Sequence, residues 1–241
     1  QVNFVHEKAF KLDLLALLCS PFVLFLVDDN IFVRDFSLAE LTAALTEDKL
    51  ALGVSLRLGR NTTYCYSLNK AQPAPSFTPA GKLLRYSWPG TASDFSYPLE
   101  VSSSLFRTAD VLPVLKVIDF KNPNSLEAHL SSHADLFAAS LPALLCYETS
   151  ITFCNPLNKV QNAAPDNRAG VESFYTSENL AALFDQNLRI AISCYAGFMP
   201  NACHQEVPLY FALKPASEAG VQQHDLAQGD PGPRISIIIP C

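Results

Sequence analysis

Three side chains that carry oxygen, Asp28, Asp29 and Asn30, directly follow an apolar run at residues 22–27. A run of that length predicts a strand buried on both faces, in the middle of a largely parallel sheet. Ligands bind outside the carboxyl ends of such strands, and two adjacent carboxylates repel each other unless a cation or ligand lies between them. Oxygen donors suit Mg²⁺ or Mn²⁺, particularly when a substrate adds phosphate oxygens. The alternative is a polar turn that merely ends the strand.

Other side chains could bind an anionic or sugar ligand. The guanidinium groups of Arg57, Arg107 and Arg168 could each hold a phosphate through two hydrogen bonds, or form ordinary surface ion pairs. The rings of Trp88 and Tyr97 could stack on sugar faces, although packing in the core or at its rim is more common for aromatic side chains.

The histidines His129 and His133 lie one helical turn apart, a spacing that could chelate a metal ion. No HExxH motif surrounds them. We therefore predict that they lie on a solvated helix face.

The spacing of apolar residues predicts an α/β fold. Residues 4–19 have helical periodicity and lead through Pro21 into the strand at 22–27. Ser37 and Glu40 have the spacing of a capping box that begins a helix ending near residue 48. The other expected elements are a strand at 52–58 with one buried face, a loop at 67–82, a short strand at 83–88, helices at 109–117, 124–136 and from 176 or 177 to about 187, and strands at 150–154 and 207–213.

The composition is that of a globular protein. Of 241 residues, 49% are hydrophobic and 17% are charged, which is enough for one core and the beginning of a second. The net charge of −6, without a cluster of Lys or Arg, argues against a nucleic-acid surface. Residues 12–27 are the only candidate for a transmembrane segment, but polar residues and Pro21 interrupt them, so we predict none.

Seven cysteines are scattered without a CxxC pair, and an odd number cannot all pair within the chain. Cys19, Cys146 and Cys154 lie in apolar contexts, where a free thiol packs as a small hydrophobic side chain. The pattern therefore favours a reducing cytoplasm over secretion.

The composition changes near the end of the chain. Residues 216–233 are rich in Ala, Gln, Gly, Asp and Pro without apolar periodicity, which predicts a linker. A new buried-strand pattern follows at 234–241. We expect a first domain at 1–215, a linker at 216–233 and the first strand of a second domain at 234–241, in a chain cut from a longer protein.

Several stretches resemble glycosyltransferases. Residues 236–241, SIIIPC, resemble the start of a family-two glycosyltransferase domain, and residues 27–32, VDDNIF, resemble the DxD motif of the GT-A fold. Other stretches resemble bacterial glycosyltransferases often found beside family-two domains. They are, in order, 56–61 (LRLGRN), 97–98 with 106–107 (YP and FR), 122–127 (NPNSLE), 158–161 (NKVQ) and 201–206 (NACHQE).

This resemblance implies a GT-A-like, Rossmann-like α/β fold with a mixed, mostly parallel sheet flanked by helices. Its first strands, which hold the nucleotide base, would precede Gln1. The implied activity is a metal-dependent, inverting transfer of a hexose from a nucleotide-sugar donor to a hydroxyl of a glycan or lipid-linked acceptor, in cell-surface polysaccharide synthesis. The implied partners are Mn²⁺ or Mg²⁺ at the donor's diphosphate and a covalently linked second glycosyltransferase domain. The expected location is the cytoplasm or the inner face of the membrane.

The resemblance also assigns a metal site. Asp28 and Asn30 would occupy the outer DxD positions with Asp29 between them, and the cation would neutralise charge on the departing nucleoside diphosphate. His204 would complete the site as a neutral imidazole ligand, while Glu206 is an equal alternative for the functional residue of its segment. Asn30 departs from the common pattern, because an amide is a neutral ligand.

Glu127 is the candidate general base, since displacement at an anomeric carbon needs a carboxylate within reach of the acceptor hydroxyl. The alternative is structural, because Asn124 and Glu127 have the spacing of a capping box. The residues expected to contact substrate are Asp28, Arg57, Trp88, Tyr97, Arg107 and Arg168.

Two other functions compete with the transferase. A sugar nucleotidyltransferase also ends a strand with a metal-binding Asp, and its glycine-rich phosphate loop would precede Gln1. A non-catalytic module that binds glycan or positions the next domain gains support from Asn30 and from Ser102-Ser103, which stand where relatives often carry Asp-Gly.

Overall fold

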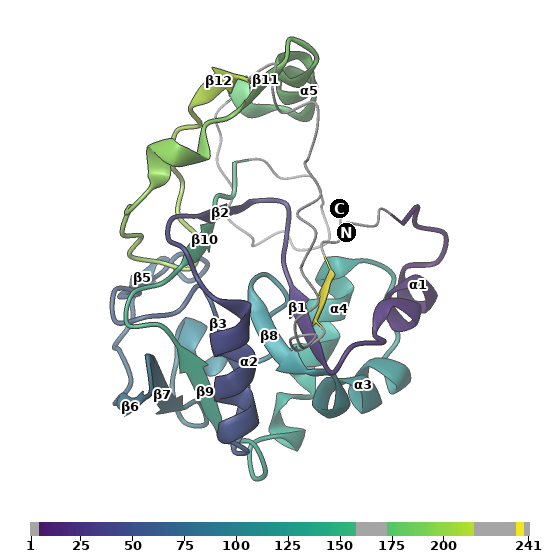
Figure 1. Ribbon diagram of the computed structural model, residues 1–241, viewed down its shortest axis with the longest axis vertical. Coiled ribbons are helices and arrows are strands. Elements are labelled where there is room, and N and C mark those ends of the chain that lie inside the picture. Colours follow the sequence, from purple (N-terminus) through teal and green to yellow (C-terminus); the bar gives the residue numbers. More distant parts are fainter. Residues whose placement is uncertain (1–4, 158–172, 215–234, 239–241) are drawn as a thin grey trace, which may run out of the picture.

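The structure is a computed structural model that describes residues 5–157, 173–214 and 235–238 (Figure 1). Its centre is a seven-stranded sheet with the order β13-β1-β8-β3-β9-β7-β6. The strands are β1 (Phe22–Phe25), β3 (Ala51–Ser55), β6 (Thr78–Ala80), β7 (Leu83–Ser87), β8 (Ser104–Arg107), β9 (Ala143–Cys146) and β13 (Ile235–Ile238).

The sheet is mixed, as expected, but mostly antiparallel. Of the six neighbouring pairs, β1 with β13 and β3 with β9 are parallel. The other four pairs are antiparallel. The expectation of a mostly parallel sheet was therefore wrong, while the α/β class is confirmed and the GT-A-like identity stays a prediction.

The short strand β8 is the main reason for this difference. It follows a serine-rich stretch that shows no strand periodicity, and it lies antiparallel between β1 and β3. Phe106 of β8 faces Gly53 of β3, where an added Cβ would lie 2.8 Å from the Phe106 ring. A larger residue than Gly53 would therefore prevent these two strands from pairing as they do.

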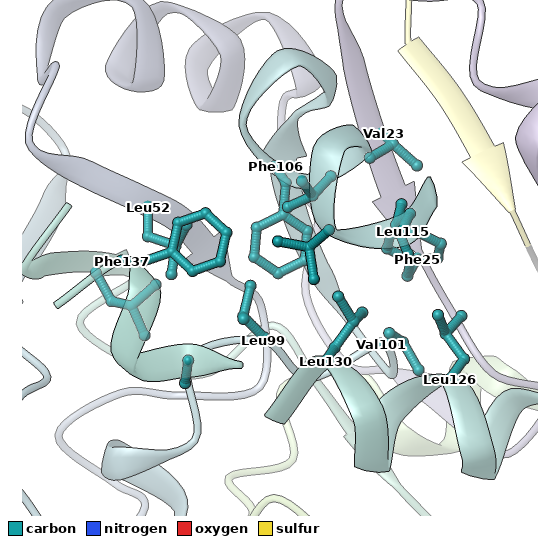
Figure 2. Packing of buried hydrophobic residues seen from close by; sticks show 14 of the residues in the cluster. Val23, Phe25, Leu52, Leu99, Val101, Phe106, Leu115, Leu126, Leu130 and Phe137 are labelled. Atoms are coloured by element: carbon teal, nitrogen blue, oxygen red, sulfur yellow. The ribbon is translucent and has the colours of Figure 1, made fainter. Parts of the chain in front are cut away.

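Helices cover both faces of the sheet. Helices α1 (Phe10–Leu17), α3 (Thr108–Val117) and α4 (Pro123–Ser132) pack against one face, and α2 (Leu38–Glu47) packs against the other. Figure 2 shows the first of these cores, in which Val23, Phe25 and Phe106 meet Leu115 and Leu126.

The second core uses the alternate residues of the same strands. Leu24, Val54 and Leu105 pack with Leu41 and Leu45 of α2. Strand β1 is therefore buried on both faces, as predicted. Strand β3 is also buried throughout, so the expectation of one buried face at residues 52–58 was wrong.

In the described part of the chain, three two-stranded sheets lie outside the main one, and a third core lies beneath two of them. Strand β2 (Asn30–Phe32), which contributes to this third core, begins in the turn that follows β1. The pairs are β2 with β10 (Thr152–Cys154), β11 (Leu188–Ile190) with β12 (Phe211–Leu213), and β4 (Tyr64–Cys65) with β5 (Lys70–Ala71). The third core includes Ile31, Phe153 and Tyr195 and lies near α5 (Ser177–Asp185), in the upper part of Figure 1.

Several local predictions hold and others do not. Ser37 caps α2 by accepting from the Glu40 backbone N–H at 3.4 Å, and Thr176 caps α5. The first helix is shorter than the predicted 4–19. The expected loop at 67–82 contains β5 and β6, and β8, β9 and β11 were not predicted. Four 3₁₀ turns are also present, at Ser93–Ser96, Ala134–Leu136, Ser173–Tyr175 and Ile192–Tyr195.

Strand β13 occupies one edge of the main sheet. It pairs in parallel with β1 from Phe22↔Ile235 to Phe25↔Ile238, and the Leu26 N–H donates to the Ile238 carbonyl at 2.9 Å. The expected linker lies outside the described residues. The domain boundaries at 215 and 234 stay predictions.

Within the described ranges, no helix is both long enough and apolar enough to cross a membrane. The six cysteines described there are all free. Cys146 and Cys154 are buried, as predicted, whereas Cys19 is exposed and does not pack as a core side chain.

Candidate functional site

Most of the side chains that the sequence predicts to be functional lie together at one end of the strands of the main sheet. Strands β1 and β3 point the same way and β8 runs opposite to both, as the pairs Leu24↔Leu105 and Ser55↔Ser104 show. The segments after β1 and β3 and the segment before β8 therefore meet. These segments carry Asp29, Arg57 and Glu100, respectively.

The turn after β1 is closed by Asn30. Its side-chain oxygen accepts from the Val27 N–H at 2.8 Å, and its side-chain amide donates to Cys154 Sγ at 3.4 Å. Asp28 is exposed, whereas Asp29 is half-buried and shares a hydrogen bond with the Cys154 thiol. Burial raises the pKa of Asp29.

One carboxylate oxygen of this turn is left without a partner. Oδ1 of Asp29 is buried and accepts no hydrogen bond from any described residue. Because a buried acceptor without a partner costs free energy, this oxygen is a candidate partner for a cation or a ligand hydroxyl.

Arg57 is buried, with 4% of its surface exposed. Its Nε lies 3.5 Å from Oε2 of Glu100. Burial alone would lower the pKa of Arg57, but the negative charge of Glu100 raises it above its ordinary value. Nη1 is also buried and has no partner in the described part of the chain. The guanidinium is therefore charged and has an unused donor.

The loop that follows β3 fixes the backbone near Arg57. The Asn61 side chain donates to Ser150 Oγ at 2.8 Å and accepts from the Ser150 N–H at 2.9 Å. Gly59 lies so close to this contact that an added Cβ would be 2.5 Å from Asn61 Oδ1. The stretch 56–61 thus has a structural reason for its glycine and asparagine.

Glu100 was not selected from the sequence. Its carboxylate accepts from the backbone N–H groups of Ser102 and Ser103 at 2.6 and 3.0 Å. It also accepts from the hydroxyls of Ser103, at 3.2 Å, and Ser104. The only sequence signal for this role is the serine run that follows the acidic residue, at positions where relatives often carry Asp-Gly.

Glu127 does not cap α4. The cap is Asn122, whose side chain accepts from the Ser125 N–H at 2.8 Å, and Ser125 Oγ accepts in return from the Asn122 N–H at 3.1 Å. The capping-box alternative of Asn124 with Glu127 was therefore wrong. Glu127 lies one residue beyond Leu126, in the interior of α4, and has no capping role.

The half-buried Glu127 side chain has an unusual electrostatic environment. Burial raises the pKa of its carboxyl to about 7, and the charge of Glu100 adds to this increase. Arg57 and a hydrogen bond from the Val101 backbone N–H act in the opposite direction. A carboxyl that titrates near neutral pH can accept or donate a proton under physiological conditions.

Tyr97 belongs to the same group. Burial raises the pKa of its hydroxyl to about 12, with a further contribution from Glu127, and the hydroxyl shares a hydrogen bond with Ser131 of α4. Tyr97 therefore stays protonated and can donate a hydrogen bond near Glu127.

His204 lies beside the β10 strand. Its backbone forms a bridge with Cys154, and its ring centroid is 6.3 Å from that of Tyr66. Burial and the nearby charge of Arg57 lower the pKa of His204 to about 3, so the imidazole is neutral. Glu206, the alternative residue, accepts a hydrogen bond from the Tyr66 hydroxyl.

The donor set fits a cation only in part. Among the described residues, no group of three or more His, Cys, Asp and Glu side chains is arranged to hold a metal ion. The Asn30 oxygen is already engaged with Val27. Asp29, with its unpaired oxygen, and the exposed Asp28 fit the mode in which Mg²⁺ takes one or two carboxylates and completes its shell with water and substrate phosphate. A ligand role for His204 stays a prediction.

Two other predicted residues, Arg107 and Trp88, do not join this site. Arg107 pairs with Phe22 at the start of β1, whereas Asp29 follows the end of β1. The two residues therefore lie at opposite ends of these strands. The Arg107 guanidinium holds Asp110 and backbone carbonyls, so it has structural partners, and its phosphate-binding role stays a prediction. Trp88 is buried in the core, where its indole N–H donates to the Leu141 carbonyl at 2.8 Å, so it is not free to stack on a sugar. Arg168 lies outside the described residues.

The histidine pair on α4 behaves as predicted. His133, at the C-cap of α4, contacts the carbonyl of His129 through Nδ1 at 2.8 Å; His129 is exposed and His133 is half-buried. This helix face is solvated.

Comparison with known proteins gives one distant similarity. The chain is 28% identical over 131 residues to the bifunctional glycosyltransferase pgtA of Dictyostelium discoideum, a match that covers 49% of this chain and 17% of that protein. The chain thus corresponds to a small part of its relative's length. No family model matches the chain, and no solved structure matches it significantly.

Proposed function

We propose that this chain forms part of a glycosyltransferase that moves a hexose from a nucleotide-sugar donor to a hydroxyl of a glycan or lipid-linked acceptor. The partial similarity to a bifunctional glycosyltransferase supports sugar transfer. The convergence of Asp29, Arg57, Tyr97 and Glu127 at one sheet edge supports a site for the reaction. Inversion of configuration, a role in cell-surface polysaccharide synthesis and a location at the inner face of the membrane are parts of this proposal.

The main support for the proposal is that a carboxyl with a pKa near neutral lies close to two buried polar atoms that have no hydrogen-bond partner. Glu127 has a pKa of about 7, and beside it Asp29 Oδ1 and Arg57 Nη1 have no partner among the residues described. Most buried polar atoms in proteins find partners within the fold, so these two atoms support a site that a ligand completes. An acceptor hydroxyl, a cation and a phosphate oxygen are the groups that this arrangement lacks.

Each side chain then has a defined role. Glu127 accepts the proton of the attacking acceptor hydroxyl, which a base with a pKa near the ambient pH does efficiently. Arg57 donates from Nη1 to an oxygen of the donor's diphosphate. The Tyr97 hydroxyl donates to the acceptor or to the Glu127 carboxylate and so orients the attack.

A divalent cation, Mn²⁺ or Mg²⁺, would supply Lewis-acid stabilisation of the departing diphosphate. The residues of this chain that would hold it are Asp28 and Asp29, with His204 as a further candidate. The Asn30 side chain keeps the turn closed so that the two carboxylates stay at the strand end.

The structure weakens the support for a non-catalytic module. That alternative rested on Asn30 and on Ser102-Ser103 in place of Asp-Gly. Asn30 closes the β1 turn, and both serines donate to Glu100. Each departure from the family pattern therefore has a structural role beside the proposed site.

Release of nucleoside diphosphate from a panel of nucleotide sugars, with Mn²⁺ and with and without oligosaccharide acceptors, tests the proposal on the full-length protein. Glu127→Gln should lower acceptor-dependent turnover by roughly 10²-fold or more, the usual contribution of a general base. Glu148→Gln removes an exposed carboxylate and is the matched control. Full turnover in Glu127→Gln would remove the proposed base, and no turnover of any donor by the unaltered protein would contradict sugar transfer.

A further inference from the structure

We infer that Glu100 is a positioning residue: it holds the guanidinium of Arg57 so that Nη1 is presented to an anionic oxygen of a bound ligand. The inference rests on the proposed function and adds to it a residue that no family pattern selected. The ligand chemistry is an acidic oxygen, supplied either by the phosphates of a nucleotide sugar or by the carboxylate of an acidic sugar.

The geometry of Glu100 is that of a fixed anchor. The residue is 2% exposed, and its carboxylate receives hydrogen bonds from two backbone N–H groups and two hydroxyls of Ser102, Ser103 and Ser104. With both oxygens held in this way, the carboxylate cannot rotate to follow a moving partner. It therefore defines one place for the guanidinium that pairs with it.

Arg57 uses only one edge of its guanidinium for this pair. Nε lies 3.5 Å from Glu100 Oε2, and Nη1 remains buried without a partner in the described ranges. An unsatisfied buried donor costs free energy, and the cost is larger when the donor is charged. A ligand oxygen at Nη1 would remove that cost, which is why the pair favours a bound state.

The surroundings favour an anion at Nη1 over a neutral group. Arg57 is almost fully removed from water, where a charge-assisted hydrogen bond is short and strong. His204, which feels the charge of Arg57, is neutral and so does not repel an anion by itself. The carboxylates of Asp29 and Glu127 also face this region and would repel an acidic ligand. An acidic oxygen bound at Nη1 therefore requires a cation beside these carboxylates or a proton on one of them.

Binding of inorganic pyrophosphate and of glucuronate, measured by calorimetry with and without Mg²⁺, tests this inference without turnover. We expect Arg57→Met and Glu100→Gln each to weaken binding of one probe by roughly tenfold, the value of one charge-assisted hydrogen bond. The affected probe identifies the source of the acidic oxygen. Glu148→Gln, an exposed acid at the same edge, should bind both probes normally.

The double variant separates positioning from a general effect on the fold. In an Arg57→Met background, Glu100→Gln should cause no further loss, because Glu100 acts only through Arg57. A further tenfold loss in that background would overturn the inference. Glu100→Gln leaves the charge of Arg57 buried without its partner, and this variant can fail to fold. In that case Ser104→Ala is the substitute, because it removes one hydrogen bond to Glu100 and keeps both charges. We expect Ser104→Ala to weaken binding by roughly threefold.

Failure of this inference is distinguishable from failure of the proposed function. Loss of probe binding in Arg57→Met with unchanged binding in folded Glu100→Gln overturns the positioning role alone. Unchanged binding of both probes in both variants overturns the anion site at Arg57. In either case, turnover of nucleotide sugars by the unaltered protein still decides whether the chain transfers sugar.

Discussion

The guanidinium of Arg107 donates a hydrogen bond of 2.7 Å to the backbone carbonyl of Leu45, in the last turn of α2. The same side chain pairs through Nε with Asp110 of α3 at 2.6 Å. One residue at the end of β8 thus holds a helix on each side. These contacts explain why Arg107, whose guanidinium could bind a phosphate, has a structural role here.

Replacement of this arginine should therefore lower stability and leave binding unchanged. Arg107→Met leaves the Leu45 carbonyl and the Asp110 carboxylate without their donor, and we expect a loss of about 2–4 kcal/mol in the free energy of unfolding. Urea denaturation measures it. Arg60→Met, which removes a half-exposed ion pair with Glu148, should cost less than about 1 kcal/mol. A raised KM for the donor at unchanged stability would show that Arg107 contacts substrate after all.

The raised pKa of Glu127 makes stability depend on pH in a defined direction. Between pH 4.5 and about 7 the unfolded chain releases this proton while the folded chain retains it. The folded state then binds more protons, so its stability decreases as pH rises through this window. The decrease from this group is at most about 3 kcal/mol, from the difference between the two pKa values.

Glu127→Gln should remove that decrease, because glutamine does not titrate. The measurement is the free energy of unfolding at pH 4.5 and pH 8 for the unaltered protein and the variant, compared as a difference so that other groups cancel. Burial of the carboxyl sets the effect, with further contributions from Arg57, Glu100, the Val101 backbone N–H and Asp29. Glu148→Gln is exposed and should follow the unaltered protein. Parallel curves for Glu127→Gln would show that this carboxyl titrates normally.

The turn after β1 gives a third prediction. In Asn30→Ala the Val27 N–H loses its acceptor and the Cys154 thiol loses its donor. We expect the Val27 amide to exchange with solvent much faster and the free energy of unfolding to fall by about 1–2 kcal/mol, with or without Mn²⁺. Hydrogen exchange by NMR measures both. Asp28→Ala, which changes an exposed side chain of the same turn, should leave Val27 protected.

Unchanged protection of Val27 in Asn30→Ala would show that the turn closes without this side chain. In that case the neutral amide would again be available as a metal ligand, as the sequence resemblance implies.

The sequence was informative where a pattern is local. The apolar run before Asp28 predicted the buried strand β1 and the polar edge that follows it, and the Ser37 cap was correct. It was less informative for β8 and β9, each only four residues long. Their pairing depends on partners far away in the chain, and their short apolar runs do not distinguish a strand from a turn.

The site shows the same division. Asp29, Arg57, Tyr97 and Glu127 were selected by residue type and resemblance, and the topology brings them together. Glu100 was missed because its role comes from the three serines that fold back on it, which no spacing rule describes. Arg107 lies away from these four residues because β8 runs antiparallel to β1, which the sequence did not predict and which places the last residue of β8 beside the start of β1.

The last prediction concerns β13, which the sequence assigned to a second domain and which pairs with β1. Ile238 is 7% exposed and packs in the first core, whereas Ile237, its neighbour in the same strand, is 50% exposed. If β13 is part of the folding unit of β1, Ile238→Ala should lower the free energy of unfolding by about 2–5 kcal/mol, the cost of a cavity in a core. Ile237→Ala should change it by less than about 0.5 kcal/mol.

Hydrogen exchange gives an independent measurement on the same pair of variants. The Leu26 N–H donates to the Ile238 carbonyl at 2.9 Å, so its protection reports directly on whether β13 is in place. Faster exchange of this amide in Ile238→Ala, with Ile237→Ala unchanged, would tie the strand to the sheet edge. Equal and small effects of both variants on the unfolding of the sheet would instead favour a strand that belongs to a separate domain, because its side chains would then contribute nothing to the core beneath β1.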